Sequence, residues 1–126
     1  MIIDTDVLIS DLRGNKKAKK VISQNIPFQI SVITYMELVQ GMRNKTELQL
    51  LLKQLKSWAV KVIQIDLNIS TRAMIYVEDY FLSHSMKLAD ALIGATSIEI
   101  NEPLLTGNYK HFEFIPNLQI KKFKPD

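Results

Sequence analysis

Short apolar runs that suit β-strands alternate with longer helical stretches along this chain, and this order restricts its fold more than any other feature. Strands are expected at residues 1–5, 28–32, 60–65, 104–106 and 118–123. Helices are expected at 16–24, from the second strand through Glu37 to about 42, and over 48–58, 69–81 and 88–98. Such alternation predicts an α/β fold, a three-layer sandwich with a mostly parallel central sheet of four to five strands.

The length of 126 residues suits one domain, 1–126, without a linker or internal repeat. No apolar run approaches the ~20 residues of a membrane span, and the N-terminus lacks the basic leader of a signal peptide. We therefore expect a cytoplasmic protein that does not bind a membrane. The absence of cysteine excludes disulfides and thiolate metal sites. A net charge of +3, with lysines gathered at 16–20 and 121–124, permits contact with a polyanion.

Three acidic residues, Asp4, Glu37 and Asp90, have apolar neighbours on both sides. A carboxylate in a buried apolar run is costly unless something compensates its charge. Several carboxylates brought together repel one another unless a cation lies between them. Oxygen-only ligands suit Mg²⁺ or Mn²⁺, so the sequence predicts an acidic metal site.

The predicted elements bring these residues to one place. Asp4 and Asp6 follow the first strand, Glu37 lies about one helical turn past the second, and Asn108 follows the strand at 104–106. Asp90 opens a long helix that can pack over the same edge. Ligands of open parallel sheets bind beyond the carboxyl ends of the strands, which is where these residues are expected.

Several polar residues also have a purely structural interpretation. Asp4 is placed to cap the helix that follows it, and Asn68 or Ser70 to cap the helix over 69–81. Asp66 is expected in a turn or first helical turn, and Asp11 is expected as a surface charge. His84, between two serines, is expected to be exposed.

Four segments resemble the motifs of PIN-domain nucleases, in order and spacing, over nearly the whole chain: 3–9 (IDTDVLI), 31–41 (SVITYMELVQG), 88–95 (LADALIGA) and 104–112 (LLTGNYKHF). The resemblance implies that Asp4, Glu37 and Asp90 are metal ligands and that the Thr5 hydroxyl lies beside the metal. Asn108 falls where many members have a fourth acid, and is assigned a catalytic place as an amide ligand or orienting group. Asp6 stands where the family often has Asn or Ser and is a possible compensating carboxylate. His111 is assigned a role in ordering its loop.

The compact size most resembles the VapC toxins of prokaryotic toxin–antitoxin pairs. The resemblance implies a metal-dependent endoribonuclease that uses Mg²⁺ or Mn²⁺ to hydrolyse RNA. It also implies a homodimer and a small antitoxin whose C-terminal segment blocks the site. Arg13 and Arg43 are candidates for holding the RNA backbone.

Two other classes of protein stay open at this stage. A signalling receiver domain would use Asp4 and Asp6 for Mg²⁺ and Asp66 as phosphoacceptor, but it leaves Glu37 and Asp90 without roles. A PIN-like domain weakened by Asn108 would bind RNA or a partner without cleaving.

Overall fold

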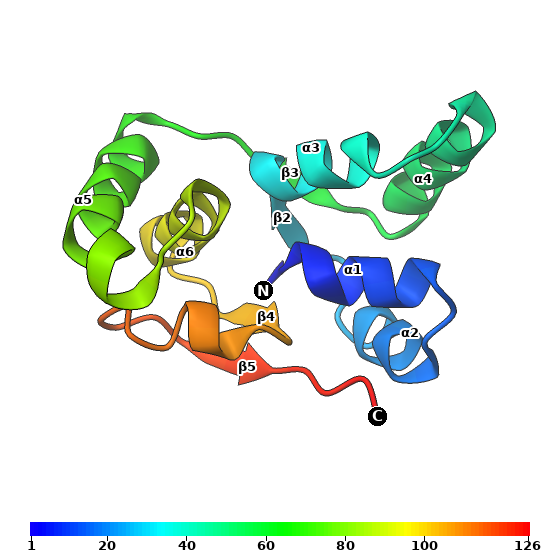
Figure 1. Cartoon of the computed structure of the whole chain (residues 1–126). Helices are drawn as coiled ribbons and strands as arrows, with labels where there is room; N and C mark the ends of the chain where they lie inside the picture. Colours follow the sequence, from blue (N-terminus) through cyan, green and yellow to red (C-terminus); the bar gives the residue numbers. More distant parts are fainter.

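The computed structural model describes all 126 residues and has a five-stranded sheet at its centre (Figure 1). The strands lie in the order β3-β2-β1-β4-β5, and every neighbouring pair is parallel. The predicted fold class is confirmed. The strands are β1 (Ile2–Ile3), β2 (Gln29–Ser31), β3 (Lys61–Ile63), β4 (Leu104–Thr106) and β5 (Ile120–Lys122).

Six α-helices and one 3₁₀ turn connect the strands. The expected helices are all present, including α1, the helix after Asp4 whose bounds the sequence did not indicate. Its buried residues include Thr5 and Asp11 as well as Val7 and Leu8, so the apolar pattern that marks a helix is interrupted. The helices are α1 (Thr5–Leu12), α2 (Lys16–Ser23), α3 (Val32–Gln40), α4 (Lys45–Ser57), α5 (Leu67–His84), α6 (Leu88–Ile100) and the 3₁₀ turn η1 (Tyr109–His111).

The sheet separates two apolar cores, and Figure 1 shows α5 and α6 on one side of it and α1 and α2 on the other. Successive strand residues point to opposite faces, so Ile3 and Leu105 join the core with α1, α2 and α4. Ile2 and Leu104 join the core with α5 and α6. None of the helices combines the length and apolar composition that a membrane span requires.

Two structural expectations are corrected. The N-cap of α5 is Asp66, not Asn68 or Ser70, because the Asp66 Oδ1 atom accepts a hydrogen bond of 2.8 Å from the Ile69 amide. Asp11 is not a surface charge: it is only 6% exposed, and its Oδ1 lies 3.1 Å from the Lys19 ammonium. The last turn of α1 faces α2, so a lysine on α2 compensates this carboxylate.

Candidate active site

The carboxyl ends of β1 and β4 carry the centre of the site. Asp4 follows β1 and is 5% exposed. Its Oδ1 accepts a hydrogen bond of 2.8 Å from the Thr5 amide, which makes Asp4 the N-cap of α1. Its Oδ2 accepts another of 2.8 Å from the Thr106 hydroxyl at the end of β4. The start of α1 and the end of β4 therefore hold this carboxylate in one orientation.

The Thr5 hydroxyl connects α1 to α3. It donates to Glu37 Oε1 at 2.7 Å, and its oxygen lies 3.0 Å from the Thr34 hydroxyl. Glu37 itself is exposed. The threonine next to Asp4 thus orients the second predicted acid, which agrees with its expected place beside the site.

Asp90 lies in the first turn of α6 and is half-buried. Its Oδ2 atom lies 3.4 Å from Nδ1 of His111, in η1. His111 was expected only to order its loop; the structure also turns it toward Asp90. The sequence offered no signal for this contact, since the two residues lie on separate elements.

Asp6 and Asn108 each form a hydrogen bond with the Thr106–Gly107 segment at the end of β4. The Gly107 amide donates to Asp6 Oδ2 at 2.9 Å, and the Asn108 amide donates to the Thr106 hydroxyl at 2.9 Å. Asn108 is exposed. The Asp6 Oδ1 atom is buried and receives no hydrogen bond from any protein group.

The acids affect one another electrostatically. Burial, the Asp6 charge and, less strongly, the Asp90 charge raise the pKa of Asp4 to about 7. Burial also raises the pKa of Asp6, although the Gly107 amide opposes the shift. Burial and the Glu37 and Asp6 charges raise the pKa of Asp90, against the attraction of His111. The four carboxylates therefore form one acidic cluster.

The residues present fit a divalent cation by their chemistry. All the donors are oxygens, the charges repel one another, and Asp6 Oδ1 is buried without a donor. In their present positions no three acidic or histidine side chains are grouped to hold an ion together. Coordination by Asp4, Glu37 and Asp90 thus stays a prediction.

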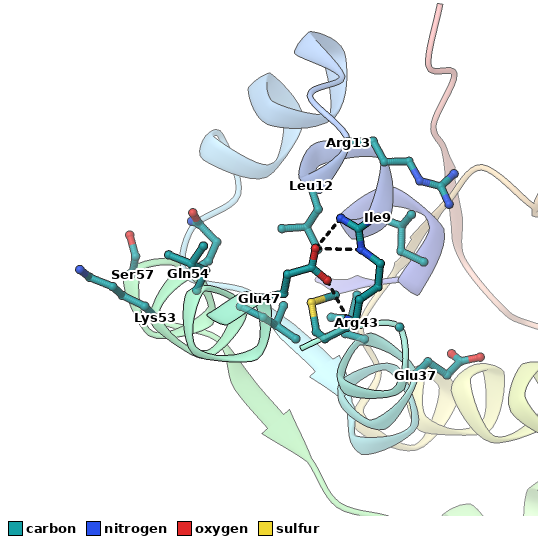
Figure 2. Close-up of a pocket in the computed structure, with 14 residues that line it drawn as sticks. Ile9, Leu12, Arg13, Glu37, Arg43, Glu47, Lys53, Gln54 and Ser57 are labelled. Carbon is teal, nitrogen blue, oxygen red and sulfur yellow. Dashed lines mark hydrogen bonds and ion pairs between the residues drawn. The ribbon is translucent and has the colours of Figure 1, made fainter. Parts of the chain in front are cut away.

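A groove of about 820 Å³ opens beside the cluster, between α1, α3 and α4, and shares Glu37 with it (Figure 2). Both Arg13 and Arg43 line this groove. The guanidinium of Arg43 binds Glu47 Oε2 at 2.6 and 3.0 Å, and its backbone amide binds Oε1 at 2.7 Å. Figure 2 shows this pair within the groove and Glu37 toward α6.

The sequence and structure have known relatives. The family model described as PIN domain matches residues 1–115, and the chain belongs to this family. No curated protein matches the chain. Among solved structures, it is similar to a chain of a toxin–antitoxin complex from Klebsiella pneumoniae, with 28% identity, a TM-score of 0.80, and 99% of this chain and 97% of that chain covered.

Two more distant structures support the fold. One is VapBC-1 from nontypeable Haemophilus influenzae, with 23% identity, a TM-score of 0.78 and 96% of each chain covered. The other is VapBC2 from Rickettsia felis bound to a promoter DNA fragment, with 20% identity, a TM-score of 0.78 and 98% of each chain covered.

Proposed function

We propose that this chain is a metal-dependent endoribonuclease and the toxin of a toxin–antitoxin pair. The observation that carries the proposal is the acidic cluster around Asp4, at the carboxyl edge of a PIN-family sheet. The similarity to a chain of the Klebsiella toxin–antitoxin complex supports the biological role. The receiver-domain alternative loses its support because Asp66, its phosphoacceptor, is the N-cap of α5.

Asp4, Glu37 and Asp90 would hold Mg²⁺ or Mn²⁺. When bound, the cation would lower the pKa of the attacking water and offset the charge that develops on the phosphate. The protein's own contribution is orientation. Thr106 and the Thr5 amide fix Asp4, the Thr5 hydroxyl holds Glu37, and His111 lies against Asp90.

Cations near the cluster would hold the RNA backbone. Arg13 lines the groove that Glu37 also borders. The Lys122 ammonium lies 4.2 Å from the centre of the Tyr109 ring, one residue beyond Asn108. Asn108 is exposed, and we assign it the orientation of substrate or water.

The decisive experiment measures RNA cleavage by Asp4→Asn and Asp90→Asn in Mg²⁺ or Mn²⁺. Each variant should lose at least about 100-fold in rate, since loss of a ligand exceeds the 10–100-fold cost of losing an outer-shell partner. The matched control is Asp79→Asn, an exposed position on α5. It removes a carboxylate charge that lies away from the site, so this variant should cleave normally. Circular dichroism verifies the fold.

Undiminished cleavage in EDTA, or by either site variant, would contradict the mechanism. A wild-type protein that binds RNA and Mn²⁺ but cuts nothing would favour the non-cleaving alternative, in which Asn108 weakens the site.

The groove offers a place for the antitoxin. Its lining includes the apolar side chains of Leu12 and Leu50, which are 41% and 62% exposed, and the cations Arg13 and Lys53. Arg43 lines it as well, paired with Glu47. This combination fits an amphipathic segment with acidic residues, and Glu37 lies where such a segment would reach the acidic cluster.

Co-expression tests this partner. Expression of the chain alone should arrest growth, and the product of a small adjacent gene should relieve the arrest and copurify with it. Leu50→Glu should abolish copurification because it places a carboxylate among the apolar side chains that line the groove, whereas Asp4→Asn should retain it. Copurification of Leu50→Glu at the wild-type level would place the partner elsewhere.

A further inference from the structure

We propose that Asp6 is a further metal ligand, which acts through its Oδ1 atom beside Asp4. The inference rests on the proposed function, because it concerns the cation of the same site. It adds a residue that the sequence offered only as a possible compensating charge.

The Asp6 carboxylate is held by one of its two oxygens. Oδ2 accepts the Gly107 amide at 2.9 Å, so the end of β4 fixes a side chain from the first turn of α1. A Cβ atom on Gly107 would lie 2.5 Å from Oδ2, well inside contact distance. This position therefore needs glycine for the carboxylate to keep its place.

The other oxygen, Oδ1, is buried and has no donor. A buried carboxylate oxygen without a hydrogen bond is costly, and natural sites rarely retain one without a reason. The charges that act on its neighbour Asp4 are those of the acids Asp6 and Asp90, and the cations that act on the cluster, His111 and Lys87, act on Asp90.

Asp6 can share a hydrogen bond with the Asp4 carboxyl only while one of the two acids is protonated. When both are ionised, no protein group satisfies Oδ1. A hard divalent cation shared with Asp4 would do so, since Mg²⁺ and Mn²⁺ bind carboxylate oxygens directly. Ligation would leave the Gly107 hydrogen bond to Oδ2 intact. The amide would then orient the ligating carboxylate, as outer-shell donors do in other metal sites.

The experiment titrates Mn²⁺ into the metal-free chain by isothermal calorimetry, with the electron paramagnetic resonance signal of free Mn²⁺ as an independent readout. Asp6→Asn keeps the shape and removes the charge, and should weaken Mn²⁺ binding by about tenfold or more. Gly107→Ala keeps the charge but displaces the carboxylate, and should weaken binding several-fold. Asp79→Asn on α5 is the charge-matched control, with unchanged affinity.

Wild-type affinity in Asp6→Asn would overturn the proposal. So would weak binding in Asp6→Asn together with wild-type binding in Gly107→Ala, because a charge that acts only through its field survives a small displacement. If Asp6→Asn does not fold by circular dichroism, Asp6→Ser is titrated instead under the same criteria. A wild-type chain that binds no Mn²⁺ would contradict the proposed function itself. This outcome differs from the results that contradict only the role of Asp6.

Discussion

At the scale of single residues, Asp4 does two things that the sequence presented as alternatives. It caps α1 through Oδ1, and through Oδ2 it binds Thr106 in the acidic cluster. The helix dipole and two hydrogen bonds favour its charged form, whereas burial and the neighbouring acids oppose it. Burial and the neighbouring acids have the larger effect, so the pKa rises to about 7.

This shift predicts how the stability of the metal-free protein depends on pH. Below about pH 4 Asp4 is protonated in both the folded and the unfolded chain. Between pH 4 and 7 the unfolded chain ionises first, so the free energy of unfolding should fall as pH rises, by up to about 4 kcal/mol for a shift from 3.8 to about 7. The raised pKa values of Asp6 and Asp90 act in the same direction.

Urea denaturation in EDTA at several pH values between 5 and 8 measures this effect. Asp4→Asn retains a capping oxygen but does not titrate, so its stability should fall less steeply. Added Mn²⁺ should recover wild-type stability at pH 7, since a cation favours the ionised cluster. A wild-type stability that is constant or rises from pH 5 to 7 would rule out this account.

At the scale of elements, the sequence predicted the strands and the placement of their ends well. Apolar runs identified all five strands, and the rule that sites lie at carboxyl ends placed Asp4, Asp6 and Asn108 near one another. Contacts between elements were less predictable. The pairings of Asp90 with His111 and of Asp11 with Lys19 depend on how helices pack, which periodicity does not encode.

The N-cap of α5 gives a prediction at this scale. Asp66→Ala removes the acceptor of the Ile69 amide and should cost about 1 kcal/mol of stability, whereas Asp66→Asn keeps an acceptor and should cost much less. Asn68→Ala, in the same first turn, should change stability by less than about 0.5 kcal/mol. Urea denaturation of the three variants checks the assignment, and a larger cost for Asn68→Ala would reverse it.

At the scale of the whole molecule, helical spacing predicts two apolar stripes, either as core or as an interface: Leu48, Leu51, Leu52, Leu55 and Trp58, and Tyr76, Tyr80 and Phe81. Leu51, Leu55, Trp58 and Tyr76 are buried, whereas Leu52 and Phe81 are 40% and 49% exposed. The four buried residues belong to the core, so only the exposed members of the stripes are available to a partner.

The exposed apolar surface lies instead on another face of α5. Leu67, Met74 and Phe81 recur every seven residues, and they are 80%, 60% and 49% exposed. Ile75 and Leu82 lie beside them, at 48% and 83% exposed. Seven-residue spacing keeps these side chains on one helical face, which they share with Thr71 and Glu78. Exposed apolar side chains grouped in this way favour an interface.

We therefore expect a homodimer that uses this face of α5. Light scattering after size exclusion should give twice the chain mass of 14.5 kDa across a micromolar dilution series. Met74→Glu with Leu82→Glu should give a folded monomer, because both side chains are exposed in the single chain and opposed carboxylates would repel across a two-fold axis. Leu50→Glu, in the groove between α1, α3 and α4, should remain dimeric. A wild-type monomer at every concentration, or a dimer that survives the double substitution, would show that α5 does not form the interface.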